Sequence, residues 1–181
     1  VYFFEDEVKQ FALSQIESRL DTRMDIANAE LNLWSRFPLA SIELENVWLE
    51  DVAVEGDTLL RVDKVFLSFN PWNFIRGKYE VKRVDLENGR IRILQDEAGD
   101  NFHFWKKNDQ VTDSTFNFNL SRVNLQDVDV FYFNDKGNVL VHALANELEL
   151  KGVFSDESSK ISWEGKLESR SCDFNGLKGL S

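Results

Sequence analysis

The chain has few of the residues that usually build metal sites or disulfide scaffolds. It contains one cysteine, Cys172, and two histidines, His103 and His142. A single cysteine forms no disulfide within the chain, so cysteine usage leaves the redox compartment open. Metal sites combine several His, Cys or carboxylate ligands at short spacing, and neither histidine has such a neighbour. We therefore expect no metal ion, and we interpret each histidine as a strand-edge or partly buried side chain.

Motifs for phosphate binding and nucleophilic catalysis are missing as well. The 9 glycines stand singly at expected turns, so no glycine-rich loop is available to hold a phosphate group. No G-x-S-x-G elbow surrounds a serine. The acidic stretch DEAGDN, residues 96–101, lacks the ligand spacing of an EF-hand loop, and we interpret it as a solvated turn. We expect a protein that is not an enzyme and has no cofactor. A hydrolase in which His103 or His142 meets a serine and a carboxylate is a distant alternative.

Positive charge is also scarce. The chain has 21 Lys and Arg residues against 32 Asp and Glu residues, which gives a net charge of −11. Nucleic-acid binding depends on cations that neutralise phosphates, so we expect no nucleic-acid partner. No apolar run reaches the ~18 residues of a membrane span. The sequence VYFF at residues 1–4, directly before EDE, nevertheless leads us to expect a membrane helix upstream.

The chain does contain a clear change of hydrophobic period. With 43% hydrophobic and 13% aromatic residues, it has ample material for a folded core. Residues 5–20 carry apolar side chains three and four positions apart, which predicts an amphipathic helix. After Asp21 the period becomes two, which predicts strands with one apolar face. The apolar positions of the helix are Val8, Phe11, Ala12, Ile16 and Leu20.

The short turns between the strands predict the topology. Turn sequences such as ENG at residues 87–89 separate the strands, and sequential strands joined in this way usually pair with each other. We therefore predict an α+β fold that is mainly β, in which the N-terminal amphipathic helix caps an extended, curved antiparallel meander with an open apolar groove. Residues 1–22 form the helix, residues 23–105 the capping region and first repeats, and residues 106–181 further β repeats. Together they make one N-terminal fragment of a β-groove domain.

Segments of the chain are similar to each other. VDLENGRIRILQD, residues 84–96, aligns without a gap on VNLQDVDVFYFND, residues 123–135. IELENVWL, residues 42–49, fits the same template, V-x-L-x-N-x-x-I. Repeats spaced about 40 residues apart predict a sheet that grows by adding similar units along one axis.

The predicted sheet is too wide for the predicted helix to cover. A helix of ~16 residues is only ~24 Å long, whereas eight or more strands lie ~4.8 Å apart. Core packing accounts for most apolar positions, but the rest of the face needs a sheet that folds over itself, a protein partner or lipid chains. The candidate lining residues are Val84, Leu86, Ile91, Ile93, Phe116, Phe118, Val128, Val130 and Tyr132.

The segment SFNPWNFIRGKYEV, residues 68–81, interrupts the strands with one predicted helical turn. Asn70 suits the N-cap, Pro71 the first helical position and Gly77 the left-handed residue past the end. The apolar residues of this turn are predicted to close the narrow end of the groove beside the opening helix. These residues are Trp72, Phe74 and Ile75.

The first part of the chain resembles a known family. FPLASIELENV and GDTLL…LSFNPWNFIRGKY, within residues 8–106, are similar to the start of the periplasmic region of AsmA-family proteins, in the form typical of Bacteroidetes-like bacteria. The resemblance implies a likeness to bridge-like lipid-transfer proteins, with an inner-membrane helix followed by a long β-groove with an apolar interior. It implies no catalytic residues, and a place at the inner membrane of a Gram-negative bacterium, facing the periplasm. Residues 116–181 match only as a generic β repeat.

These features predict a non-enzymatic lipid-handling or outer-membrane-biogenesis module whose apolar groove shields phospholipid acyl chains. The expected partners are phospholipid, the membrane through the upstream helix, and outer-membrane assembly proteins. The alternative is a structural or interaction module that docks a protein partner on its sheet face or edge without lipid.

Overall fold

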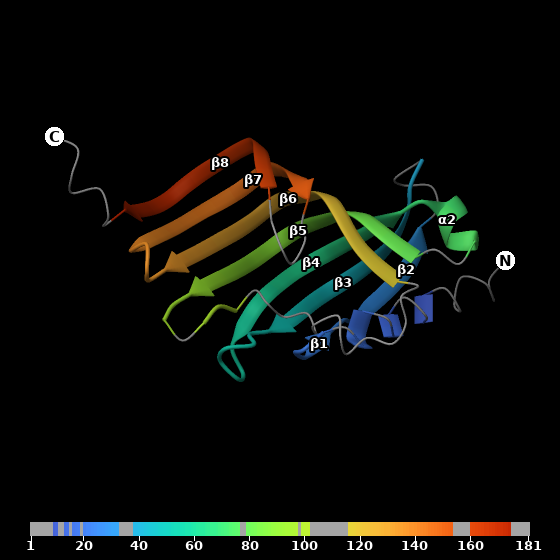
Figure 1. Ribbon diagram of the computed structural model, residues 1–181, viewed down its shortest axis with the longest axis horizontal. Coiled ribbons are helices and arrows are strands. Elements are labelled where there is room, and N and C mark those ends of the chain that lie inside the picture. The colour runs from blue at the N-terminus through green and yellow to red at the C-terminus, as the bar shows by residue number, and fades with distance from the viewer. Residues whose placement is uncertain are drawn as a thin grey trace.

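The computed structural model shows one open β-sheet that takes up most of the described chain (Figure 1). The mainly β fold class is therefore confirmed. The structure describes residues 9–10, 13–14, 16–18, 20–32, 38–76, 79–97, 99–101, 116–153 and 160–174. Within these ranges, the backbone alone is described for residues 74–75, 79, 116–119, 152–153 and 160–174.

Eight strands form the sheet, and one short helix lies between two of them. The elements are β1 (Met24–Asp25), β2 (Asn28–Asn32), β3 (Ala40–Glu50), β4 (Thr58–Phe69), α2 (Pro71–Ile75), β5 (Tyr79–Gln95), β6 (Phe116–Asn134), β7 (Val139–Val153) and β8 (Lys160–Phe174). Along the sheet the order is β1-β3-β4-β5-β6-β7-β8, and β2 also pairs with β3. Both β1 and β2 lie along the same edge of β3, beside residues 48–49 and 41–45 respectively.

The predicted antiparallel meander is wrong at one place, because β5 and β6 run parallel. The two strands start at the same end of the sheet, where Tyr79 pairs with Phe116. A parallel pair needs a long connection that brings the chain back, and residues 96–115 provide it. The return begins at once, since Asp96 N–H donates to the carbonyl oxygen of Gly99 at 2.8 Å. The other strand pairs of the described sheet are antiparallel, as predicted.

Only part of the predicted opening helix lies within the described residues. Those described between residues 9 and 18 are helical, and Leu20 N–H donates to the carbonyl oxygen of Ile16 at 3.2 Å. Ile16 and Leu20 are buried, with 4% and 6% exposure, as their place in the apolar stripe requires. The rest of the stripe lies outside the described residues, so the complete helix stays a prediction.

A line of Asn and Asp residues crosses the sheet from β3 to β7 and is left out of the β-ladders. Between β5 and β6, for example, Glu87 pairs with Gln126 and Gly89 with Val128, so one residue is skipped in each strand. The skipped residues, which we call the Asn/Asp row, are Asn46, Asp63, Asn88, Asp127 and Asn146. In β3, β5 and β6 the skipped residue has a φ of 52°, 54° and 53° respectively. Asn and Asp tolerate this left-handed conformation better than other non-glycine residues.

The Asn/Asp row shifts the side-chain alternation of each strand by one residue. In β5 the apolar positions are even before the row, at Val84 and Leu86, and odd after it, at Ile91 and Ile93. Without the skipped residue, the second half of the strand would turn its apolar side chains to the other side of the sheet. The row therefore gives these long strands one continuous apolar face.

The residues next to the Asn/Asp row, on the side away from α2, are small. We call this second line the small-residue row; it consists of the cross-strand partners Val47, Val62, Gly89, Val128 and Ala145. Its valines and alanine are at most 3% exposed. A Cβ on Gly89 would lie 2.3 Å from the carbonyl oxygen of Arg61 and 2.4 Å from Cγ1 of Val62. At this point β4 and β5 are too close for any larger residue.

Replacing Gly89 with alanine is expected to lower the free energy of unfolding by ~3 kcal/mol, because the new methyl group would meet the backbone of β4. Gly137, in the β6–β7 turn, is a matched control, since a Cβ there would come no closer than 3.4 Å to another atom. Urea unfolding followed by circular dichroism measures both variants. Equal stabilities of Gly89→Ala and Gly137→Ala would contradict the close approach at Gly89.

Candidate functional site

The structure places seven of the nine predicted lining residues on one face of the sheet, which we call the apolar face. They alternate along β5 and β6 in phase with the residues of the buried core cluster. The seven are Val84, Leu86, Ile91, Ile93, Val128, Val130 and Tyr132. The backbones of Phe116 and Phe118 lie in β6, but their side chains lie outside the described part of the chain.

The parallel pairing of β5 and β6 explains the strongest repeat in the sequence. Val84 pairs with Val123, and Ile91 pairs with Val130. The apolar positions that align in the sequence are therefore cross-strand partners, and the gapless alignment is the register of the ladder. Similar residues thus stand beside each other ~4.8 Å apart, which makes the apolar face continuous across the two strands.

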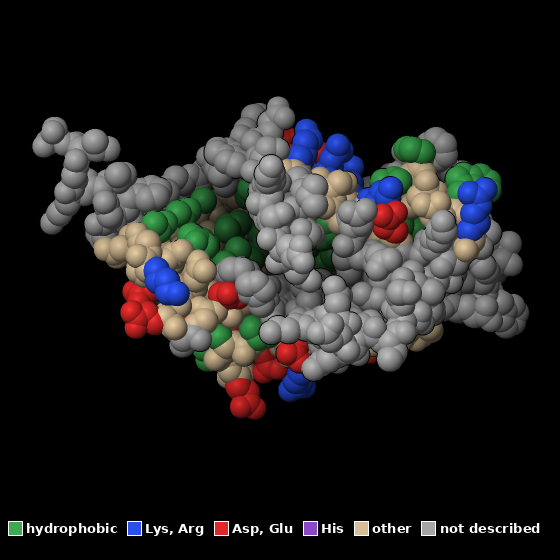
Figure 2. Space-filling model, viewed as in Figure 1, with side chains coloured by type: hydrophobic (Ala, Val, Ile, Leu, Met, Phe, Trp, Pro, Cys, Tyr) green, Lys and Arg blue, Asp and Glu red, His purple; other side chains and the backbone are tan. Residues whose placement is uncertain are grey.

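Burial of the apolar face decreases from the small-residue row toward the far ends of β5, β6 and β7. Val128 and Ala145 have 0% exposure. Ile93, Tyr132 and Val141, which form one cross-strand row, are only half-buried. Figure 2 shows hydrophobic side chains gathered in a hollow over this part of the sheet. This region therefore has apolar surface available for contact with another molecule.

The opposite face of the sheet carries charged cross-strand ladders. Arg83 donates to Asp85 through Nε at 2.9 Å and through Nη2 at 2.6 Å. Arg122 and Lys151 both pair with Glu149, at 2.8 and 2.7 Å. Asp85 is buried, with 3% exposure, whereas the pairs of Glu149 are partly exposed and contribute little to stability individually. The opposite face therefore carries these ion pairs toward α2, whereas at the far ends of β5 to β7 it holds a half-buried apolar row of Leu94, Phe133 and Leu140.

His142 lies on the charged face beside Asp129. Its Nε2 is 2.8 Å from Oδ1 of Asp129, and its ring meets the ring of Phe131 edge-on with the centroids 6.2 Å apart. The side chain is 34% exposed, which confirms the interpretation of a partly buried imidazole. Among the described residues, no group of three or more His, Cys, Asp and Glu side chains could hold a metal ion. His103 and the side chain of Cys172 lie outside this part of the chain.

The prediction that α2 closes the end of the groove is wrong for Trp72, whose side chain is 68% exposed. Asn70 caps the helix as predicted, because its Oδ1 accepts hydrogen bonds from the N–H groups of Trp72 at 2.9 Å and Asn73 at 3.4 Å. The side chains of Phe74 and Ile75 lie outside the described part of the chain.

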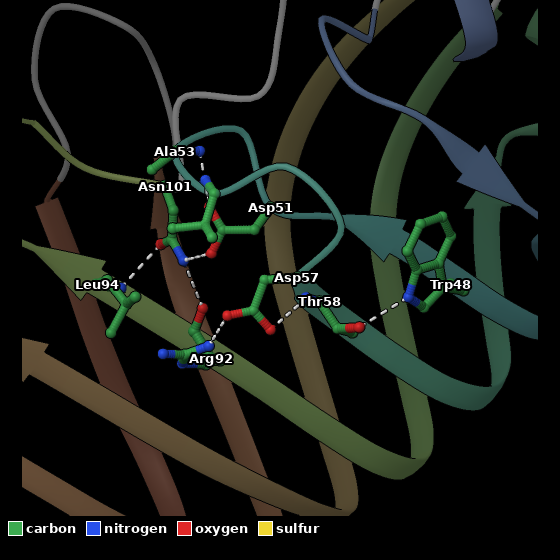
Figure 3. A network of polar contacts seen from close by, with 9 residues as sticks. Trp48, Asp51, Ala53, Asp57, Thr58, Arg92, Leu94 and Asn101 are labelled. Carbon is green, nitrogen blue, oxygen red and sulfur yellow. Dashed lines mark hydrogen bonds and ion pairs between the residues drawn. The ribbon is translucent and has the colours of Figure 1, made fainter.

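A buried polar network at the end of β5 was not predicted (Figure 3). Asn101, expected in a solvated turn, has 0% exposure. Its side chain accepts from Leu94 N–H at 2.8 Å and donates to the carbonyl oxygen of Arg92 at 2.9 Å and to Asp51 Oδ2 at 2.7 Å. Asp51 is 2% exposed, and its Oδ1 accepts from Ala53 N–H at 2.7 Å. The amide and both carboxylate oxygens therefore all have partners.

This network completes β5 where the neighbouring strand ends. The pairing of β4 with β5 stops at Ile91, so the last residues of β5 have no strand on that side. Asn101 supplies the missing partners, since its backbone N–H also donates to the carbonyl oxygen of Leu94 at 3.1 Å. The same contacts hold the start of the connection that returns the chain for the parallel pairing of β5 and β6.

Asp57 joins the β3–β4 loop to the side chain of Arg92 in the same region (Figure 3). Asp57 Oδ1 accepts from Thr58 N–H at 2.8 Å, and its Oδ2 pairs with Nη1 of Arg92. The hydrogen bond from Thr58, followed by that from Arg92, holds the pKa of Asp57 below its ordinary value of 3.8. Thr58 Oγ1 in turn accepts from Nε1 of Trp48 at 2.8 Å.

Replacing Asn101 with alanine is expected to cost ~3 kcal/mol of unfolding free energy, because Leu94 N–H and the buried carboxylate of Asp51 lose a partner. Asn28→Ala is the control, since the Asn28 amide bonds to Glu30 at 3.1 Å and Glu45 at 3.3 Å near the surface. Chemical unfolding of both variants measures the difference. A loss for Asn101→Ala no larger than that for Asn28→Ala would contradict a structural role for the network.

The depressed pKa of Asp57 predicts a pH effect. The folded pKa lies below the unfolded value, so the contact adds stability above pH 3.8 that is lost as the pH falls through the folded pKa. Arg92→Met is expected to move the pKa of Asp57 part of the way back to 3.8, since the bond from Thr58 N–H remains. A carboxyl-carbon NMR titration follows this shift. An unchanged pKa in the variant would show that Arg92 does not act on Asp57.

Comparisons with known proteins give no relatives for this chain. No family model matches it, and a search of the curated proteins finds no match either. Within the part of the chain that the structure describes, no helix has the length and apolar character needed to cross a membrane. The functional conclusion therefore depends on the sheet, its two faces and its two ends.

Proposed function

We propose that the chain is a non-enzymatic lipid-handling module in which the apolar face shields the acyl chains of phospholipids. The curved sheet forms an open groove, and polar head groups lie at its open seam. The module is held at the inner membrane of a Gram-negative bacterium and faces the periplasm, as the resemblance to AsmA-family proteins implies. A part in outer-membrane biogenesis, with outer-membrane assembly proteins as partners, belongs to the same proposal.

The observation that carries this proposal is the half-buried cross-strand row of Ile93, Tyr132 and Val141. From this row the half-buried apolar face continues through Ile91 and Val130 and ends at Val128, which has 0% exposure. The described positions of this strip carry no charged side chain. Its polar atom is the hydroxyl of Tyr132, which accepts a hydrogen bond from Nδ2 of Asn134 at 3.0 Å. An uncharged, half-buried strip suits an acyl chain.

The openness of the sheet supports the same occupant. Among the described strands, β8 pairs only with β7, and β1 and β2 pair only with β3, so the sheet does not close on itself. Removing apolar surface from water contributes ~25 cal/mol per Å², which favours coverage of the half-buried strip. A flexible acyl chain can cover this strip without side chains of matching shape. A protein partner on the sheet face or edge is the alternative occupant, and the experiment below separates the two.

Replacing Ile93 with asparagine is expected to reduce bound phospholipid about tenfold, because an unpaired amide against an acyl chain costs ~1–3 kcal/mol. Lipid is extracted from the purified 181-residue chain, expressed in the periplasm of a Gram-negative host, and quantified by mass spectrometry. Leu94→Asn is the matched control. Leu94 is the next residue of β5, is equally half-buried and faces the opposite side of the sheet.

Phospholipid on the wild-type chain and on Leu94→Asn, with little on Ile93→Asn, is the expected result. Lipid-free wild-type protein would overturn the proposal. Equal lipid on all three proteins would place the lipid away from the apolar face. A protein partner that stays bound after complete delipidation would favour the docking alternative instead.

A further inference from the structure

The two ends of the sheet have opposite charge. Beyond the cross-strand row of Leu49, Leu60, Ile91, Val130 and Ala143, the described residues of β3 to β7 and their turns hold two cations, Arg92 and Lys136, against eight carboxylates. We call this the acidic end; its carboxylates are Glu50, Asp51, Glu55, Asp57, Asp96, Glu97, Asp100 and Asp135. Figure 2 shows Asp and Glu side chains gathered toward this end.

The end that carries α2 is basic, although the whole chain has a net charge of −11. We call it the basic end; its described cations are Arg76, Lys82, Arg83, Arg122 and Lys151. Glu80 lies among them and pairs with Lys82. In the described part of the chain, the cross-strand row just inside them holds four carboxylates, Glu30, Glu43, Asp85 and Glu149. Asp85 and Glu149 pair with cations of the basic end, and Glu43 pairs with Lys64. Figure 2 shows the Lys and Arg side chains near α2 and along the adjoining strand ends.

Three of these cations stand in one cross-strand row. Arg83 pairs with Arg122, and Arg122 pairs with Lys151. Like charges directly opposite each other destabilise a sheet. Asp85 pairs with Arg83, and Glu149 pairs with Arg122 and Lys151. Outward from the row that holds Asp85 and Glu149, the described residues of β2 to β7 and their connections carry five cations against one carboxylate, Glu80. An external anion can approach this positive charge.

The same end presents an exposed indole on a fixed turn. Trp72 is 68% exposed. Its backbone N–H donates to Oδ1 of the capping residue Asn70, which holds the turn in place. Arg76, at the end of this turn, is also exposed. Trp prefers the boundary between lipid head groups and acyl chains, because its ring is large and apolar and its N–H remains able to donate a hydrogen bond.

We propose that the basic end of the sheet docks against an anionic lipid surface, with Trp72 inserted at the level of the head groups and the basic residues facing the lipid phosphates. The charge polarity orients the molecule, because the acidic end is repelled by the same surface. A membrane fits both the indole and the cations, whereas an acidic protein would account for the cations alone. Docking does not require acyl chains on the apolar face, so it goes beyond the proposed function and can be tested apart from it.

Vesicle flotation of the 181-residue chain tests the docking. We expect the protein to float with vesicles of phosphatidylcholine and phosphatidylglycerol in equal parts, to stay behind with phosphatidylcholine alone, and to lose binding as salt is raised. Each cation near an anionic surface contributes about fivefold to binding. Arg76→Glu should therefore weaken binding by roughly tenfold or more. Lys136→Glu, the same charge change at an exposed position of the acidic end, should have little effect.

Trp72→Ser tests the indole, with Val54→Ser as its control, because Val54 is an exposed apolar residue at the acidic end. Brominated lipids should quench tryptophan fluorescence in the wild-type chain and markedly less in Trp72→Phe. Equal binding to neutral and anionic vesicles, or equal losses in Arg76→Glu and Lys136→Glu, would overturn the proposal. Binding to polyglutamate without binding to vesicles would also overturn it. Circular dichroism confirms that each variant is folded.

The result also separates docking from lipid handling. Ile93→Asn should keep its binding to anionic vesicles even where it has lost its acyl-chain ligand, since Ile93 lies toward the acidic end, far along β5 from Arg83. Loss of vesicle binding in Ile93→Asn would contradict docking through the basic end.

Discussion

The rest of this structure depends on the Asn/Asp row. Each strand from β3 to β7 has one residue in this row that is left out of the pairing with its neighbours. In a strand of 15 residues or more, such as β5, β6 or β7, side chains alternate between the two faces of the sheet. One extra residue therefore moves every side chain after it to the opposite face. Here the extra residues fall in one line across the sheet, and in β3, β5 and β6 Asn or Asp occupies it with a positive φ that other side chains tolerate less well. The apolar positions of every strand change phase together. One face stays apolar from end to end, and the charged ladders stay on the other.

The sequence alone predicted much of this fold because alternation is a local signal. It located the strands, the apolar positions of β5 and β6 and the cap at Asn70. The template V-x-L-x-N-x-x-I even contains the change of phase, since Leu86 and Ile91 are an odd number of residues apart, but we interpreted it only as a repeat. The parallel pairing was missed because residues 96–115 carry no periodic signal. Asn101 was missed because a turn asparagine is usually exposed, and only its partner Asp51, 50 residues away, explains its burial.

The two proposed functions use different parts of the sheet, the apolar face for acyl chains and the basic end for membrane docking. The half-buried strip of the apolar face offers an uncharged contact surface, while the opposite face pairs its ions toward α2. The ends differ in a second direction, with exposed Trp72 and a surplus of cations at one and carboxylates at the other. Two departures from the usual pattern occur at the basic end, the exposed side chain of Trp72 and the adjacent cations Arg83, Arg122 and Lys151. An exposed indole and a row of like charges stand at the same end of the sheet, and the proposed docking on an anionic lipid surface would use both.

The most direct test of this account is a scan of β5 with a photo-crosslinking residue, placed at one position at a time and activated in living cells. The account predicts phospholipid adducts at Val84, Ile91 and Ile93, and none at Asp85, Arg92 or Leu94. The pattern should thus change from even to odd positions across Asn88. An alternation that kept one phase through Asn88 would contradict the continuous apolar face, and adducts to protein alone would contradict its lipid occupant.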